Sequence, residues 1–299
     1  MFRHHPLQFN SPNIRSEIIP LQALPINRGF FFIAAIPFLI MNDLLDVKTI
    51  SRNGEQITLN YDYSVIQNHV KSKKPVIIRN LLSVDESSKI RKFAIEMRKL
   101  QSPSSPKIFK KSSNYHRIDN NEEKSQVKCI LHLHAFFYWN KETEPVKNYF
   151  KRLFRLRNIL SDLPEEYALS DIVDGYVSLP LVQQYPRGGG YMQEHQDPDN
   201  GQKVVVNTIL SECPKDYETG GLFYRNNDGK KIYVDKELKP GDAFIFYPTL
   251  SHGVDPIDAN VKLNWENDDG RWMCFSTLVT ESSLTGENSS GAAKPVSKK

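Results

Sequence analysis

The chain has 299 residues, of which 39% are hydrophobic and 25% charged, a globular composition that leaves ample chain for a buried core. A net charge of +4 is too small to predict nucleic acid or an anionic membrane as the main partner. The three cysteines, Cys129, Cys213 and Cys274, lie far apart and form no disulfide or zinc-site pattern, which favours a reducing, cytoplasmic compartment.

The two ends of the chain differ from the rest in composition. Residues 1–28 are rich in proline, and the apolar run GFFFIAAIPFLIM that follows is too short to span a bilayer. We therefore interpret residues 1–40 as a disordered or non-native extension, with Met41 as the candidate native start; a membrane-proximal anchor is the alternative. Residues 281–299 are rich in serine, glycine and lysine, and they predict a disordered tail.

Residues 41–174 predict an α+β lead-in. β-Rich runs predict strands at residues 57–61 and 75–79, and apolar residues at helical spacing predict helices at residues 84–100 and 146–160. Ser83 is a plausible N-cap of the first helix. Residues 101–128 are polar and predict a loop, and the basic residues of 151–157 are interpreted as the solvated face of the second helix.

From residue 175 the sequence pattern changes to short runs of residues that favour β-strands. These runs are separated by the turn sequences RGGG, DPDNG, ETGG, NNDG and KPGD. The expected strands are residues 175–185, 191–195, 203–210, 221–225, 231–234, 243–247, 252–254 and 272–279. Short strands at this density predict a double-stranded β-helix (jelly roll) over residues 175–280. The fold class is therefore α+β, with the lead-in packed on a jelly-roll core.

Three residues of this core have the chemistry of a metal site. His195 and Asp197 lie two residues apart in an extended segment, so both face the same way. His252 follows the apolar strand at 243–247. Two histidines and one carboxylate are the ligands of a facial Fe(II) site with three open positions. Arg271 begins the last strand, where a guanidinium suits a carboxylate-bearing co-substrate. A hydrogen-bonded core or loop histidine is the alternative reading of His252.

A second histidine pair, His132 and His134, also shares one face of a segment. No third ligand accompanies it in the sequence. We interpret the pair as part of a half-buried strand or of a surface that faces the substrate.

The motifs YPRGGGY, HQD, VVVNTIL, GGLFY, KPGD, HGVDPI and GRW follow one another in this order. As a set they resemble the catalytic core of the Fe(II)/2-oxoglutarate-dependent dioxygenases, closest to the prolyl-hydroxylase-like branch. The resemblance covers about a third of the chain, from Tyr185 to Val279.

The resemblance implies the cofactors and the residues that hold them: Fe(II) on His195, Asp197 and His252, and the co-substrate 2-oxoglutarate on Arg271, Tyr185 and Thr208. It implies that O₂ is consumed, that succinate and CO₂ are released, and that an unactivated C–H bond is hydroxylated, with desaturation or cyclisation left open. The carboxylate of Asp197 matters here, because related halogenases have a small residue at that position.

One departure from the family pattern concerns Arg271. It follows His252 by 19 residues, because a polar insert occupies residues 258–270, and the family spacing is shorter. Lys262, within the insert, is the substitute candidate for the co-substrate carboxylate.

The sequence leaves the substrate open. Loops at residues 188–190, 198–203 and 258–270 are expected at the mouth of the site, where Arg187, Tyr191 and the pair His132 and His134 would suit an anionic or zwitterionic small metabolite. A peptidyl (prolyl-type) hydroxylase, a metal cupin enzyme that does not use 2-oxoglutarate, and a non-catalytic binding module are the alternatives. The oligomeric state is also left open.

Overall fold

The computed structural model describes residues 43–103, 115–119, 127–136, 141–199, 201–282 and 294–296. The predicted extension at residues 1–40 lies outside this range, as does most of the predicted tail. The core strands are β6 (Tyr176–Pro186), β7 (Gly190–Gln196), β8 (Val205–Ile209), β9 (Gly221–Arg225), β10 (Lys231–Tyr233), β11 (Ala243–Phe246), β12 (His252–Ile257) and β13 (Gly270–Thr280). Each strand predicted for this region is present.

The core strands divide into two antiparallel layers. One layer has the order β6–β13–β8–β11 and the other the order β7–β12–β9–β10. The chain thus passes from one layer to the other as it runs from β6 to β7, β8 and β9. This winding is that of a double-stranded β-helix, so the predicted jelly roll is confirmed.

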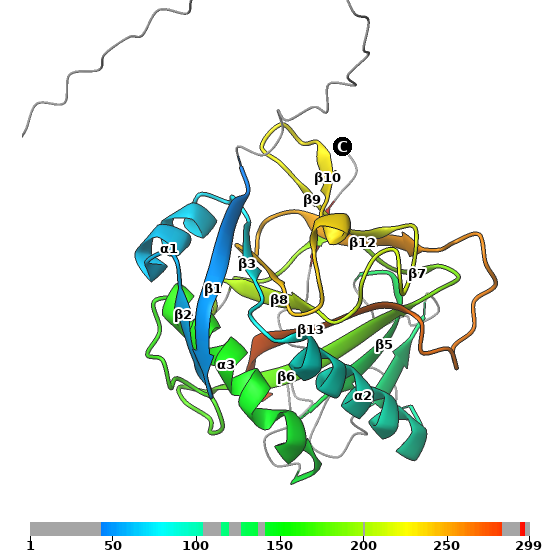
Figure 1. The fold of residues 1–299 in the computed structure, drawn as a ribbon, viewed down its shortest axis with the longest axis horizontal. Coiled ribbons are helices and arrows are strands. Elements are labelled where there is room, and N and C mark those ends of the chain that lie inside the picture. The colour runs from blue at the N-terminus through cyan, green and yellow to red at the C-terminus, as the bar shows by residue number, and fades with distance from the viewer. Residues whose placement is uncertain are drawn as a thin grey trace, which may run out of the picture. The chain divides into compact units, whose positions relative to one another are not determined.

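The lead-in supplies further strands and three helices. They are β1 (Leu45–Asn53), β2 (Gln56–Leu59), α1 (Tyr63–Lys71), β3 (Val76–Arg79), α2 (Val84–Leu100), β4 (Tyr115–Ile118), β5 (Cys129–Ala135) and α3 (Glu144–Leu160). Strand β3 extends the first layer by pairing with β11, while β5 pairs with both β6 and β7 and so links the two layers. In Figure 1, α2 and α3 lie along one side of the sheet that contains β6 and β13.

Helix α2 begins where the sequence predicts it. The Ser83 side chain accepts a hydrogen bond from the Glu86 amide, and the Glu86 side chain accepts one from the Ser83 amide. This reciprocal capping box satisfies two backbone donors that the first turn leaves unpaired. The sequence predicts neither helix α1 nor strands β1 and β4; β4 lies within the range expected to be a loop.

Two apolar clusters pack against opposite faces of the first layer. The helix-side core joins the helices to residues such as Val182, Val206 and Cys274, and the inner core fills the jelly roll with residues such as Tyr185, Val205 and Met273. Since side chains alternate along a strand, neighbouring residues of β6, β8 and β13 enter different cores. This alternation decides which side chains reach the interior of the jelly roll.

The basic run at residues 151–157 corrects the expectation of a solvated helix face. Lys151 and Arg155 pair with Glu55, but Arg152 and Arg157 are buried. Arg152 forms two hydrogen bonds with the Glu86 carboxylate, at 2.9 and 3.0 Å. The prediction is wrong for these two arginines because α3 packs against the sheet on one side and against α1 and α2 on others.

The side chains of His132 and His134 do not face the interior of the jelly roll. Their neighbours Leu131 and Leu133 on β5 enter the inner core, so the two histidines point to the opposite face of the strand. There the His132 ring bonds the Tyr115 hydroxyl at 2.8 Å. The interpretation of the pair as a substrate-facing surface is therefore wrong. The alternative, a buried strand, holds, and both histidines are fully buried.

This buried pair predicts acid sensitivity. Burial, more than the charge of Arg98, lowers the pKa of His132 and of His134 from 6.5 to about 3. Between these values the unfolded chain binds protons that the folded protein does not. Stability is thus complete above pH 6.5 and falls as the pH drops toward 3, by up to about 1.4 kcal/mol per pH unit for each histidine. Urea unfolding at several pH values should show a slope shallower by about one proton in His134→Phe; an unchanged slope would contradict this account.

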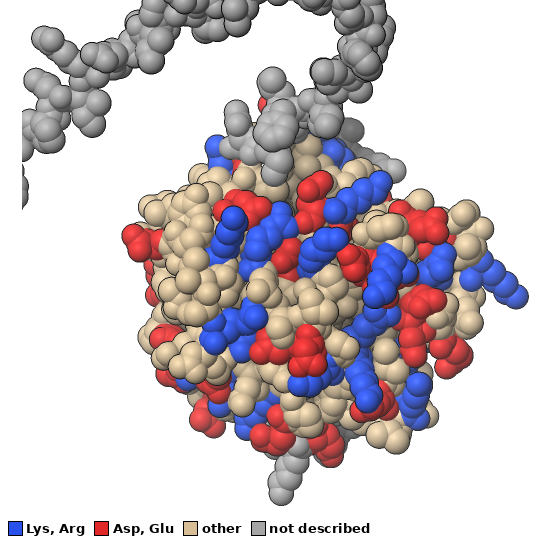
Figure 2. Space-filling model, in the orientation of Figure 1, with Lys and Arg blue, Asp and Glu red and all other residues tan. Residues whose placement is uncertain are grey.

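Basic and acidic side chains are interspersed over the face shown in Figure 2, as expected for a surface of exposed ion pairs. Within the described part of the chain, no helix combines the length and hydropathy needed to cross a bilayer.

Candidate metal and co-substrate site

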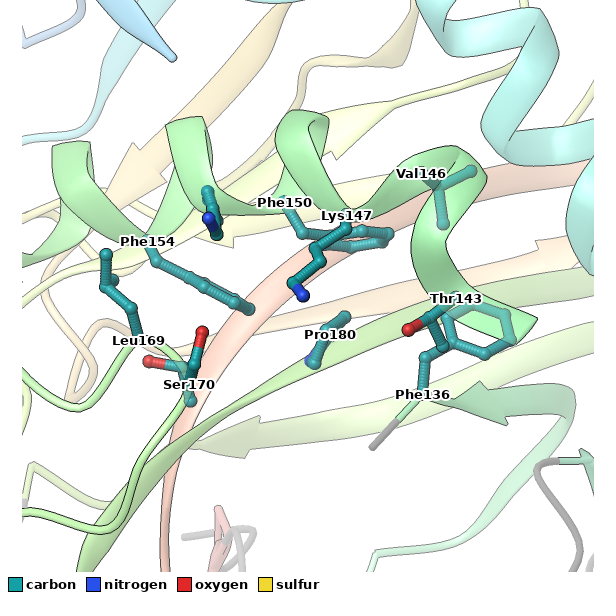
Figure 3. Close-up of a pocket in the computed structure, with 11 residues that line it drawn as sticks. Phe136, Thr143, Val146, Lys147, Phe150, Phe154, Leu169, Ser170 and Pro180 are labelled. Atoms are coloured by element: carbon teal, nitrogen blue, oxygen red, sulfur yellow. The ribbon is translucent and has the colours of Figure 1, made fainter. Parts of the chain in front are cut away.

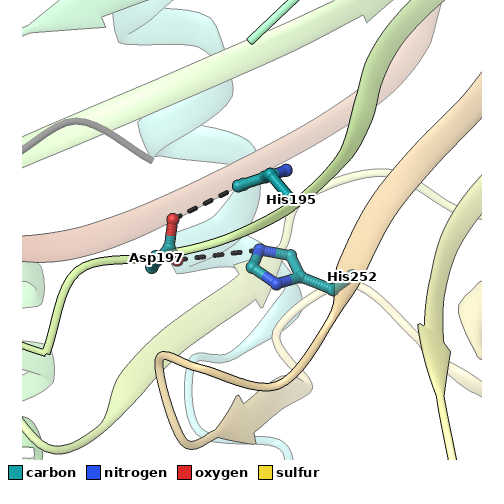
Figure 4. Close-up of side chains that lie close together, drawn as sticks. All are labelled: His195, Asp197 and His252. Atoms are coloured by element: carbon teal, nitrogen blue, oxygen red, sulfur yellow. Dashed lines mark ion pairs between the residues drawn. The ribbon is translucent and has the colours of Figure 1, made fainter. Parts of the chain in front are cut away.

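His195 and His252 lie on neighbouring antiparallel strands of the second layer. His195 is on β7 and His252 begins β12, and the strand register places the two residues directly opposite each other. Asp197 follows β7 immediately. One ligand atom from each of the three residues lies within 4.8 Å of the other two, and the side chains converge in Figure 4. The folded chain thus brings together the three residues that the sequence predicts.

Backbone carbonyls orient both histidines. Nδ1 of His195 lies 2.8 Å from the Gln193 carbonyl oxygen, and Nδ1 of His252 lies 2.9 Å from the Leu250 carbonyl oxygen. A carbonyl only accepts hydrogen bonds, so each Nδ1 carries a proton, which leaves Nε2 of each ring as the nitrogen that can bind a metal. These Nε2 atoms face Asp197, at 3.4 and 3.6 Å from its carboxylate oxygens. A hydrogen bond from the other ring nitrogen to a backbone carbonyl is typical of metal-binding histidines.

The charges of the three side chains are coupled. Burial, together with the neighbouring His195, lowers the pKa of His252 to about 4. Burial acts against the charged forms of Asp197 and His195 as well, but it does not prevail: His252 and His195 together lower the pKa of Asp197, and Asp197 raises that of His195. The site without a metal therefore favours one proton between His195 and Asp197, which a bound cation would displace.

Apolar rings enclose the cluster on the inner side. The Phe246 ring lies 4.5 Å from the His252 ring, centre to centre, and Tyr224 is opposite His252 on β9. Both aromatic residues are buried. A co-substrate and a substrate would enter at the coordination positions that the three side chains leave open.

Arg271 faces the interior of the same jelly roll. It is opposite Tyr185 in the β6–β13 pair and is 1% exposed. Its Nε and Nη2 donate to the Asp235 carboxylate, at 2.7 and 3.1 Å. Asp235 is fixed in turn by the Tyr217 hydroxyl and the Leu222 amide. Nη1 has no partner among the described residues. Asp235 thus occupies one edge of the guanidinium, and the edge that carries Nη1 remains available for a second carboxylate.

The long spacing before Arg271 does not move it out of the core. The insert runs along β6, where the Gln184 side chain donates to the carbonyls of Asn267 and Asp269, at 2.8 and 2.9 Å. It also passes against the RGGG turn, where a Cβ on Gly188 would lie 2.4 Å from the Leu263 backbone. Lys262 is exposed on this insert. The insert is thus accommodated at the ends of β6 and β13, and β13 starts in the register that buries Arg271.

Tyr185 lies opposite Arg271 in the β6–β13 pair. Its hydroxyl donates to the Gln183 side chain at 2.8 Å. Burial raises its pKa; nearby Arg271 opposes the rise, and Asp197 adds to it. Tyr185 thus faces the inner core, where its ring centre lies 5.7 Å from the Arg271 guanidinium carbon; its contact with the co-substrate stays a prediction.

The structure corrects the prediction that Thr208 faces the co-substrate. It pairs with Cys274 and Ala243, which belong to the helix-side core, so its side chain is on the outer face of the layer. The neighbouring Asn207 pairs with Phe275 and Phe244 on the inner face. The sequence does not show that Asn207 is the inward-facing polar residue of β8. Every residue of the strand is buried, and no alternation of polar and apolar residues distinguishes its two faces.

No protein-family model matches the chain. No curated protein matches it significantly. Among solved structures, the chain is similar to a Trichoplax adhaerens prolyl hydroxylase in complex with a hypoxia inducible factor oxygen degradation domain peptide fragment (16% identity, 76% of this chain and 92% of that one, TM-score 0.49). It is also similar to a Pseudomonas putida prolyl-4-hydroxylase (13%, 72% and 97%, 0.44) and to SnoN, a non-heme alpha ketoglutarate dependent epimerase from nogalamycin biosynthesis (12%, 79% and 96%, 0.47). The strand order and pairing of the chain itself define its fold.

Proposed function

We propose that this protein is an Fe(II)- and 2-oxoglutarate-dependent oxygenase that hydroxylates a small metabolite. The observation that carries the proposal is the convergence of His195, Asp197 and His252, with both Nε2 lone pairs directed at one point inside a jelly roll. Two nitrogens and one carboxylate suit Fe(II) and leave coordination positions open. Nη1 of Arg271, buried and without a partner among the described residues, fits the distal carboxylate of 2-oxoglutarate.

Iron and 2-oxoglutarate, when bound, would supply an oxidant formed from O₂, with release of succinate and CO₂. The residues of the chain would do the remaining work. His195, Asp197 and His252 would hold the metal, Arg271 would orient the co-substrate, and the Tyr185 hydroxyl would lie beside it. The apolar rings around the cluster would exclude water from the reacting groups.

A surface basin supports an anionic small molecule as the substrate. It has a volume of about 590 Å³, and its lining residues Tyr247 and Thr249 flank Pro248, whose carbonyl accepts a hydrogen bond from the Asp197 amide. Its lining residues are Lys71, Lys73, Asp162, Asp199, Lys203, Tyr247 and Thr249. Lysine ammonium groups at its rim would attract a carboxylate or phosphate. A peptidyl substrate is the runner-up.

All three cysteines are free and buried, which supports a reducing compartment, and we propose the cytoplasm. Small-molecule binding without nucleic acid remains our prediction for the partners.

Anaerobic titration with Fe(II) and then 2-oxoglutarate tests the proposal. We expect one Fe(II) per chain and, on addition of 2-oxoglutarate, a weak visible charge-transfer band from its chelation. Admission of O₂ should then produce succinate. Iron binding without the band would indicate a metal cupin that does not use 2-oxoglutarate, whereas failure to bind any divalent metal would indicate a binding module.

A further inference from the structure

Arg157 is the one cation of α3 without a carboxylate partner among the described residues. Lys147 pairs with Glu144, Lys151 with Glu55, Arg152 with Glu86 and Arg155 with Glu55. Arg157 is 0% exposed and has only neutral partners. Its Nε and Nη2 donate to the Asn158 side chain, at 3.2 and 2.7 Å, and Nη2 also donates to the Ser178 hydroxyl, at 2.8 Å. Nη1 has no partner among the described residues.

This charge is costly to bury. An isolated cation in the protein interior loses its hydration, and neutral hydrogen bonds return only part of that loss. Arg157 lies in the last turn of α3, where the helix dipole offsets up to about half a charge. Burial lowers the pKa of Arg157 to about 9, so the guanidinium still carries its proton at neutral pH. A negative charge nearby would complete the compensation.

A small cavity adjoins this arginine. It lies between α3 and β6, has a volume of about 30 Å³, and is walled by Phe136, Phe150, Phe154 and Pro180, as Figure 3 shows. Ser178 belongs to the same wall. The cavity is on the outer face of the first layer, because Pro180 and Ser178 alternate with Leu179 and Leu181 of the inner core. It is thus separate from the candidate metal site.

Three residues that line the cavity contact Arg157 or are themselves positively charged. The Ser178 hydroxyl accepts its hydrogen bond from Arg157, so its own proton is available to a group in the cavity. The Phe154 ring lines the cavity and lies 5.3 Å from the Arg157 guanidinium carbon. Lys147 also lines the cavity, and in Figure 3 its side chain extends toward Pro180 and Ser170. The cavity is therefore lined by hydroxyl groups and two lysines, with Arg157 behind Ser178, and no carboxylate is among the described residues that line it.

We propose that the cavity beneath α3 is a binding site for a small monovalent anion, of the size of a halide or a formate ion. Its volume exceeds the roughly 10–15 Å³ that a cavity needs to hold one water molecule, so a single small ion fits. Ser178 and Lys147 contact the anion, and Arg157 supplies the charge behind Ser178. The aromatic walls favour weakly hydrated anions, because these lose least on leaving water. Bromide and chloride therefore bind better than fluoride.

Thermal unfolding of the full-length protein tests this site. Sodium chloride, bromide, fluoride and formate are each compared with sodium gluconate, whose anion is too large for the cavity, at constant ionic strength. The expected result is a saturable rise in melting temperature, on the order of 3–6 °C at ten times the dissociation constant. The comparison of halides with formate distinguishes a halide site from a carboxylate site.

Three variants make the test specific. Arg157→Gln and Ser178→Ala should lose the saturable rise, while Arg155→Gln, on the same helix but paired with exposed acids, should keep it. Ser178→Ala retains every charge and serves if Arg157→Gln does not fold. A bromide soak should place an anomalous peak in the cavity. No halide response in the native protein, or an equal response in all variants, would overturn the proposal and assign the cavity to water.

Discussion

Replacing His252 with alanine should lower the affinity for a divalent metal by at least about 100-fold, more than the 10–100-fold typical of losing an outer-shell partner. His252 contributes one of the two Nε2 lone pairs, and the remaining pair, His195 and Asp197, would keep their mutual proton without it. Isothermal titration with Co(II) as an oxygen-stable probe measures the loss. Succinate release under O₂ should fall below detection in the same variant.

His132→Ala is the matched control. It removes another fully buried histidine, but one that faces away from the jelly-roll interior. The melting temperature should fall, and the stoichiometry and affinity for Co(II) should remain. If His252→Ala binds Co(II) as tightly as the native protein does, the metal site assigned to the three residues is wrong.

Replacing Arg271 with glutamine should weaken 2-oxoglutarate binding by about 10–150-fold, the value of one or two hydrogen bonds between charged groups. Metal affinity should not change, because Arg271 touches none of the three metal-binding residues in the hydrogen bonds and ion pairs of the described chain. The dependence of the charge-transfer band on 2-oxoglutarate concentration measures the loss under anaerobic conditions.

Arg271→Gln also leaves the Asp235 carboxylate buried and uncompensated, which costs about 3–5 kcal/mol of stability. The double variant Arg271→Gln/Asp235→Asn removes both charges, so it should recover stability without recovering 2-oxoglutarate affinity. Lys262→Gln should leave both quantities unchanged. Normal binding in Arg271→Gln with weak binding in Lys262→Gln would show that the insert, rather than β13, holds the co-substrate.

Much of the fold was predictable because turn sequences mark the ends of the core strands. Each predicted core strand is present, and the spacing of His195 and Asp197 placed both on one side of β7. The metal site was predictable because side chains two residues apart on an extended strand point the same way, whichever strands pair with it. His252 could be joined to it because it begins a strand.

The errors arise where a strand or helix is buried on both sides. Strand β8 carries no polar alternation, so the sequence could not show that Asn207 rather than Thr208 faces inward. Likewise, β5 alternates clearly, but nothing in its sequence says which face meets the helices, so the sequence left open whether His132 and His134 face the substrate. Arg157 of α3 was assigned to solvent because an arginine at helical spacing is ordinarily exposed, and only the tertiary packing buries it.

The carbonyls that orient His195 and His252 come from Gln193 and Leu250, each two residues earlier in the same stretch of chain. The tautomer of both rings is therefore inherited from the main chain and requires no dedicated side chain. Replacement of neighbouring side chains could reshape the substrate pocket without disturbing the direction of either lone pair. His195 and His252 lie on neighbouring strands, so metal binding depends on the pairing of β7 with β12. Local separation of these two strands should release the metal before the rest of the protein unfolds.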